Sequence, residues 1–120
     1  MNRGPEPTGP PPGSITIERE GDRRVLYLRG ELDTAVAERF RRQQGREPLV
    51  VEVIDAGGVS FISSTALAVM VRCAEASLAA GRRPALRTSS HAVERILRLA
   101  GVEAAFGRAE TAPGHAETPG

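Results

Sequence analysis

Three consecutive hydroxyl side chains, Ser63, Ser64 and Thr65, follow a β-branched stretch and precede a helical pattern of apolar residues. They therefore fall at a predicted helix N-terminus, where backbone N–H groups lack intrahelical partners and the helix dipole is positive. One hydroxyl there can cap the helix by accepting a backbone hydrogen bond. A phosphorylated hydroxyl would instead place about −1.5 to −2 charges at a backbone site that favours anions, and it would repel a partner docked there. The residues alone leave both interpretations open.

Other groups that could do chemistry are few and scattered. All 16 cationic side chains are Arg, which excludes Lys-based chemistry such as a Schiff base or a phosphate-binding lysine. The chain has no G-x-S-x-G elbow for a hydrolase nucleophile. Its single Cys73 and its two separated histidines, His91 and His115, do not form a metal-ligand set. The sequence therefore predicts a binding protein rather than an enzyme, without a metal or another cofactor.

Charge and composition exclude several classes of partner. Sixteen basic and 15 acidic side chains give a net charge of +1, whereas nucleic-acid binders usually have a basic excess. The N-terminal residues lack the apolar region of a signal peptide, and the longest mainly apolar stretch, residues 65–71, is too short to cross a bilayer. We expect no direct contact with nucleic acid, no membrane insertion, a cytoplasmic location, and a monomer or weak dimer.

The length of 120 residues suits one domain flanked by two tails. Residues 1–13 contain five Pro and three Gly, and residues 107–120 are small and polar with further Pro and Gly. Neither composition can build a hydrophobic core, so we expect both tails to be disordered. The folded unit is expected over residues 14–106.

The elements that must position the hydroxyl run begin with a predicted hairpin. Residues 14–19 and 24–29 have the alternation of two antiparallel strands joined by a short turn. A helix capped by Asp33 or Thr34 is expected next. Its narrow apolar face is expected at Val36, Ala37 and Phe40, and its end at Gly45.

A β-branched run at residues 49–54 predicts a central strand, either covered on both faces or packed under helices. We expect residues 55–58 to break this strand, with the Gly57-Gly58 pair in a tight turn, and residues 59–62 to form a short extended piece. The helix that follows is expected to run to about residue 80. Its buried stripe is expected at Leu67, Met70, Val71, Ala74 and Leu78.

The last third of the folded unit predicts one more strand and one more helix. The strand is expected at residues 84–88, and Ser89 or Ser90 is expected to cap the helix. The buried stripe of that helix is expected at Val93, Ile96, Leu97 and Ala100. Residues 102–106 would form a short last strand or simply cover the core. The order β-β-α-β-α-β-α predicts an α/β (or α+β) domain, a small mixed sheet of four to five strands with three to four helices packed on it.

Four stretches, in this order and spacing, resemble the STAS family (sulphate transporter and anti-sigma factor antagonist domains), and in particular the small bacterial anti-anti-sigma factors. They are G-E-L-D at residues 30–33, the central strand ending in an acidic residue at 49–55, V-S-F-I-S-S-T-A-L at 59–67, and the last-helix pattern at 90–102. The resemblance covers residues 14–106 and implies a STAS-like fold.

The resemblance also implies a switch. In that family the partner is an anti-sigma factor, a serine kinase with the histidine-kinase-like ATPase fold, and it phosphorylates a serine at the start of the second helix. This acceptor falls on Ser64. The unphosphorylated protein would bind the kinase and release a sigma factor, and a phosphatase would reset the switch. The partner-binding residues would be Asp33, Ser63, Ser64, Thr65 and Leu67.

Two positions keep alternatives open. Ser63 stands where the family usually has Asp, so a carboxylate that could help to position the acceptor is missing. This change also fits a constitutive, non-phosphorylated STAS subunit of a signalling assembly or of a lipid-transport ATPase complex. Asp33 matches the acidic residue of the family near the acceptor, and it is equally suited to cap the first helix.

Overall fold

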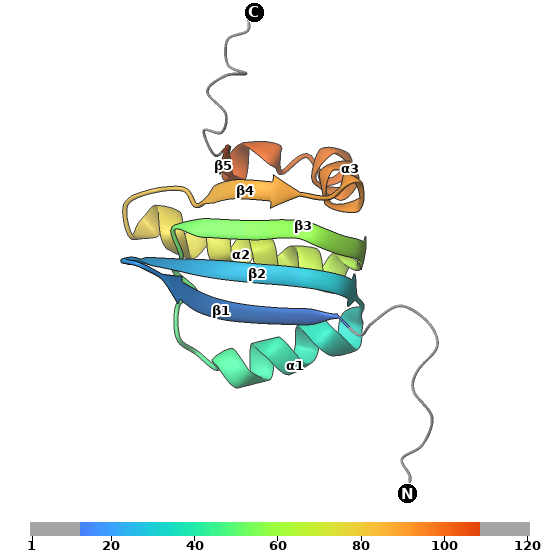
Figure 1. The fold of residues 1–120 in the computed structure, drawn as a ribbon, viewed down its shortest axis with the longest axis horizontal. Helices are drawn as coiled ribbons and strands as arrows, with labels where there is room; N and C mark the ends of the chain where they lie inside the picture. The colour runs from blue at the N-terminus through green and yellow to red at the C-terminus, as the bar shows by residue number, and fades with distance from the viewer. Residues whose placement is uncertain (1–12, 109–120) are drawn as a thin grey trace, which may run out of the picture.

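The computed structural model describes residues 13–108, and these residues form a five-stranded mixed sheet with three α-helices (Figure 1). The spatial order of the strands is β1-β2-β3-β4-β5, with β1 and β2 antiparallel and the remaining pairs parallel. The strands are β1 (Ser14–Glu20), β2 (Arg23–Leu32), β3 (Val53–Ile62), β4 (Ala85–Ser89) and β5 (Gly107–Arg108). The helices are α1 (Thr34–Gln44), α2 (Ser64–Ala79) and α3 (His91–Ala100), followed by the short 3-10 helix η1 (Glu103–Ala105). The predicted fold class is confirmed.

The core lies between the sheet and α1 and α2. In the hairpin, Ile15 faces Leu28 across the strands, and both side chains are buried. Alternate residues of β1 and β2 therefore point into the same core, as the period of two requires. Figure 1 shows α2 running behind β2 and β3, with α1 beside β1. This arrangement brings the start of each helix to the end of the strand that precedes it.

The central strand differs from its prediction. β3 begins at Val53, and residues 49–52 form a connecting segment in which Leu49 and Val51 are still buried. The strand also continues through Gly57 and Gly58 to Ile62 instead of breaking there. Neither glycine has a positive φ, so the expected tight turn is wrong, and the irregularity is absorbed by shifts in register against β2 and β4.

The buried faces of α2 and α3 agree with the predicted stripes in part. In α2 the buried residues are Ala66, Val69, Met70, Cys73, Ala74 and Ser77. Of the predicted stripe, Leu67 and Val71 are half-buried and Leu78 is 57% exposed. Met70 and Ala74 are buried as predicted, and the rest of the buried face is supplied by residues outside the predicted stripe. In α3 the expected Val93 and Leu97 are buried and Ile96 is half-buried against the core, but Ala100 is exposed.

The end of the domain closes through a short strand rather than at the expected boundary. Residues 102–106 contain η1, and Phe106 is buried against the core. Gly107 and Arg108 then pair with β4 as β5, two residues beyond the predicted limit of 106. The rest of the predicted tails, residues 1–12 and 109–120, lies outside the described residues. Within residues 13–108, no helix is long and apolar enough to cross a membrane.

Candidate functional site

Two helix N-termini lie side by side at one edge of the sheet. Because β2 and β3 are parallel, their carboxyl ends meet at the same edge, and Leu32 pairs with Ile62 there. The N–H of Ser63 donates to the carbonyl of Leu32 at 2.9 Å, which ties the two strand ends together. Just beyond, the hydroxyls of Thr34 and Thr65 lie 3.5 Å apart. The starts of α1 and α2 therefore form one continuous surface.

The structure gives the three consecutive hydroxyls different environments. Ser63 is the N-cap of α2, and its Oγ accepts a hydrogen bond from the N–H of Ala66 at 3.1 Å. Thr65 is half-buried and faces Thr34 across the helix pair. Ser64 is the first residue of α2, and it alone of the three is exposed. Ser63 is thus a structural cap, whereas the side chain of Ser64 is accessible from solvent.

Asp33 caps α1 in the same way that Ser63 caps α2. Its Oδ1 accepts a hydrogen bond from the N–H of Val36 at 2.9 Å, and its side chain remains exposed. Between the two caps predicted for this helix, the structure selects Asp33 over Thr34. Leu67 lies one turn into α2, half-buried against the core. The structure therefore brings Asp33 and residues 63–65 to one edge, with Leu67 a turn away.

The local electrostatics favour an added anion at Ser64. Neither α1 nor α2 carries an acidic side chain in its first turn. The positive ends of two helix dipoles thus lie close to this hydroxyl, with the carboxylate of Asp33 as the nearby opposing charge. A phosphoryl group on Ser64 would meet unpaired backbone N–H groups of α2.

A groove beside this edge was not predicted from the sequence. It lies between the end of β3 and α3 and has a volume of about 700 Å³. Phe61 is 51% exposed and Leu99 is 75% exposed, and both line it. Its charged or titratable lining consists of His91 and Arg95. The alternation along residues 59–62 could have predicted that Phe61 is exposed. Successive side chains of a strand point to opposite faces, so Phe61 must point outward if Ile62 points inward.

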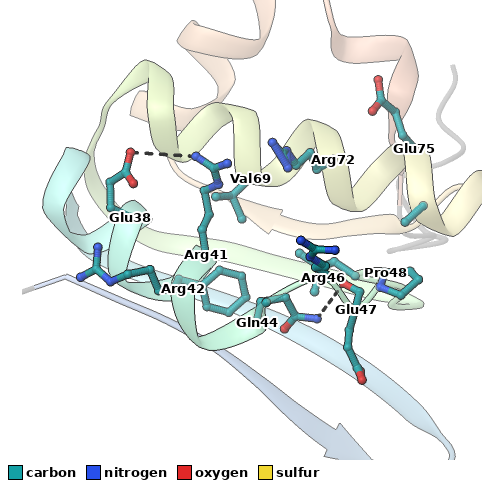
Figure 2. Close-up of a pocket in the computed structure, with 14 residues that line it drawn as sticks. Glu38, Arg41, Arg42, Gln44, Arg46, Glu47, Pro48, Val69, Arg72 and Glu75 are labelled. Carbon is teal, nitrogen blue, oxygen red and sulfur yellow. Dashed lines mark hydrogen bonds and ion pairs between the residues drawn. The ribbon is translucent and has the colours of Figure 1, made fainter.

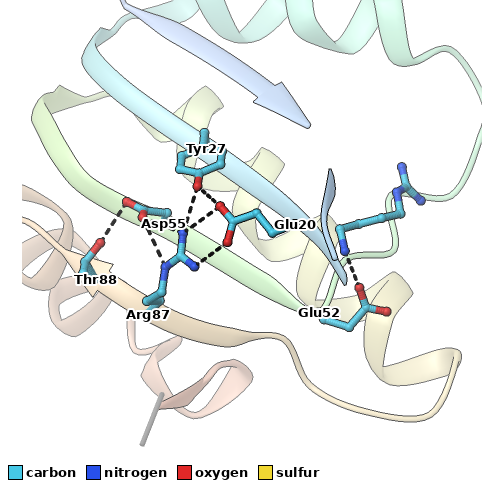
Figure 3. Close-up of polar contacts among 7 residues, drawn as sticks. Glu20, Tyr27, Glu52, Asp55, Arg87 and Thr88 are labelled. Carbon is cyan, nitrogen blue, oxygen red and sulfur yellow. Dashed lines mark hydrogen bonds and ion pairs between the residues drawn. The ribbon is translucent and has the colours of Figure 1, made fainter. Parts of the chain in front are cut away.

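Asp55, the acidic residue expected at the end of the central strand, belongs to a structural network (Figure 3). Arg87 bonds to Asp55 at 3.0 Å and to Glu20 at 2.9 Å, and it also donates to the hydroxyl of Tyr27 at 3.0 Å. Tyr27 in turn donates to Glu20, and Thr88 donates to Asp55 at 2.8 Å. The network joins β1, β2, β3 and β4 on the face of the sheet away from α2.

Hydrogen bonding sets the protonation of this network. The bond from Arg87 and then that from Tyr27 lower the pKa of Glu20 to about 2. Burial acts to raise the pKa of Asp55, but the bonds from Thr88 and Arg87 outweigh it, and the pKa is lowered. The hydroxyl of Tyr27 has a raised pKa, chiefly because it donates to Glu20. At neutral pH, Glu20 and Asp55 are therefore ionised and Tyr27 is neutral, which suits a fixed structural role.

The remaining nucleophile and metal-ligand types form no further site in the described part of the chain. Cys73 is buried, and burial raises the pKa of its thiol to about 12, so the thiolate is suppressed. Among residues 13–108, no three His, Cys, Asp or Glu side chains are grouped closely enough to hold a metal ion.

The comparisons with known proteins agree with the fold. The small mixed sheet with its three helices has the STAS-like fold that the sequence resemblance implied. The family model described as the STAS domain matches residues 14–117, so the chain belongs to the STAS domain family. The search of curated proteins found no relative that matches this chain.

Proposed function

We propose that this STAS domain protein is an anti-sigma factor antagonist, a cytoplasmic binding protein rather than an enzyme. In its unphosphorylated form it binds an anti-sigma factor kinase with the histidine-kinase-like ATPase fold, and a sigma factor is released. Phosphorylation at Ser64 ends this binding, and a phosphatase restores it. The observation that carries the proposal is the exposure of Ser64 at the paired helix starts, while Ser63 and Thr65 are engaged beside it.

The domain can accept a phosphoryl group at Ser64 without losing its fold. The side chain is exposed, so the group does not have to be buried. It sits at the first position of α2, where a negative charge interacts favourably with the helix dipole. The effect of phosphorylation is therefore expected on binding rather than on folding.

A docked partner would respond strongly to the same group. Phe61, three residues before Ser64, offers an exposed apolar contact, and Leu67 offers a half-buried one on the following turn. A partner that covers these apolar side chains would also remove water from Ser64. Desolvation of a dianion in such an interface is costly unless the partner supplies a matched charge. Asp33, exposed at the start of α1, would lie within the same interface.

The capping role of Ser63 does not need the carboxylate that the family usually has at this position. Ser63 accepts the capping bond that an Asp would accept, and both residue types are preferred N-caps. The start of α2 is therefore preserved, and one negative charge beside Ser64 is absent. A kinase that acts on this protein would have to position the Ser64 hydroxyl through its own groups.

The test compares Ser64→Ala and Ser64→Glu with the wild-type protein. Affinity capture from the native cells on the Ser64→Ala variant is expected to retrieve an anti-sigma kinase, which is then purified. In calorimetric titrations Ser64→Ala should bind this kinase as the wild type does. Ser64→Glu should bind at least about tenfold more weakly, because a charge enters the interface. Gln43→Glu is the matched control, because it adds a negative charge at an exposed position near the C-terminal end of α1, away from the helix starts.

Equal affinities of Ser64→Glu and wild type would contradict the switch. The second candidate, a constitutive STAS subunit of a signalling assembly or of a lipid-transport ATPase complex, is favoured by the missing carboxylate at Ser63. In that case the capture would retrieve components of such an assembly. Their binding would be insensitive to charge at Ser64, because Ser63 caps α2 and the exposed Ser64 side chain would lie outside the contact.

A further inference from the structure

A second hollow lies between the C-terminal half of α1, the segment at residues 45–49, and α2 (Figure 2). Its volume is about 750 Å³, within the range of roughly 300–1,000 Å³ that is typical of small-molecule sites. Phe40, Leu49 and Val69 line it and are buried, so its floor is apolar. Its lining includes none of the residues around Ser64.

Three guanidinium groups from three different segments border this hollow. Arg41 comes from α1, Arg46 from the connection after it, and Arg72 from α2, and Figure 2 shows all three reaching toward the same space. Arg42 also lines the hollow, but its side chain points away from the other three in Figure 2. The convergence therefore involves specific arginines and is more than the general abundance of arginine in the chain.

Acidic side chains also lie at the rim of the hollow, but there are fewer of them than arginines. Glu38 approaches Arg41 at 3.9 Å, at the outer limit of an ion pair, and both side chains are exposed. Glu47 and Glu75 point away from the three guanidiniums (Figure 2). The lining has four arginines and three glutamates in all, so the hollow keeps a formal excess of one positive charge.

We propose that this hollow binds a small organic phosphate, with phosphoryl oxygens on Arg41, Arg46 and Arg72 and its carbon body on the apolar floor. The planar fork of arginine matches phosphate oxygens in a bidentate manner. A single carboxylate satisfies one such fork, whereas two linked phosphoryl groups have enough oxygens for three. The apolar floor adds a contact that an inorganic anion would not use.

The test is a titration of the full chain with three probes at low ionic strength, followed by calorimetry and by NMR of the arginine Nε–H groups. ADP has both the linked phosphoryl groups and the organic body of the expected ligand. Pyrophosphate has the phosphoryl groups alone, and adenosine has the organic body alone. ADP is expected to bind most tightly, pyrophosphate more weakly and adenosine not measurably. Binding should weaken as salt is raised, because the charges are exposed.

Arg46→Gln and Arg72→Gln should each weaken ADP binding by about tenfold, because each removes a charge-assisted contact. Arg39→Gln is the matched control, since Arg39 is an exposed arginine of α1 that does not line the hollow. Thermal unfolding of each variant checks that the fold is kept. The proposal is overturned if none of the probes binds, or if the control loses as much affinity as the other two variants. Pyrophosphate binding as tight as that of ADP would also contradict it, since the apolar floor would then contribute nothing.

Discussion

Two adjacent serines, Ser63 and Ser64, have different tasks at the start of α2. Ser63 holds the start of α2 through its bond to Ala66, while Ser64 remains exposed beside it. The sequence predicted that one of three hydroxyls caps the helix, but it could not say which. That choice depends on where β3 ends, and the capping geometry follows from the backbone at Ser63.

Removal of the Ser63 hydroxyl tests the structural half of this division. Ser63→Ala should lower the free energy of unfolding by about 1 kcal/mol, because the N–H of Ala66 loses its acceptor. Ser63→Asp should stay within about 0.5 kcal/mol of wild type, since Asp is an equally good cap. Urea unfolding measures both, with Ser60→Ala as the exposed-serine control. A Ser63→Ala variant as stable as wild type would show that the cap contributes nothing.

At the scale of elements, the order of strands and helices could be predicted because each has a clear period or a clear cap. The path of β3 through Gly57 and Gly58 could not, since glycine pairs usually mark turns. The reason lies in the neighbouring strand. A Cβ on Gly57 would lie 2.8 Å from Oγ1 of Thr88, so β3 and this side chain of β4 approach each other there. A contact between residues so far apart in sequence leaves no local signal.

Replacement by alanine is therefore expected to cost more stability at Gly57 than at Gly58. Gly57→Ala should lower the free energy of unfolding by about 1–3 kcal/mol, because Thr88 must give up its bond to Asp55 or the strands must separate. Gly58→Ala should change it by less than about 0.5 kcal/mol, because its Cβ would meet Arg29 at 3.6 Å, an ordinary contact. Denaturant unfolding of the pair measures the difference. Equal costs would contradict the close approach at Gly57.

At the scale of the whole molecule, the sheet has two different faces. One face holds the core with α1 and α2, and the other carries the network around Arg87 (Figures 1 and 3). The β-branched run around Ile54 predicted burial of the central strand, and Ile54 is fully buried. The network was not predicted, because Glu20, Tyr27 and Arg87 come from separate parts of the sequence. The groove at Phe61 was missed for a similar reason, since its second wall is supplied by α3.

The network makes the free energy of unfolding depend on pH in the acid range. The folded-state pKa of Glu20, about 2, is below its ordinary value of 4.5, so its contribution is present above pH 4.5 and is lost as the pH falls toward 2. Arg87→Gln should therefore be less stable than wild type at pH 7, and the difference should shrink as the pH falls. Urea unfolding from pH 7 to pH 2.5 measures both proteins. A difference that stays constant over this range would mean that Arg87 acts through packing alone.

Phosphosite occupancy tests whether Ser64 is the phosphorylated residue of a partner switch. The protein would be isolated from its native cells during growth and under stress, and occupancy at Ser63, Ser64 and Thr65 measured by mass spectrometry. We expect phosphate on Ser64, in an amount that changes with condition, and none on its two neighbours. The absence of phosphate in every condition, or phosphate on Ser63 or Thr65 instead, would contradict it.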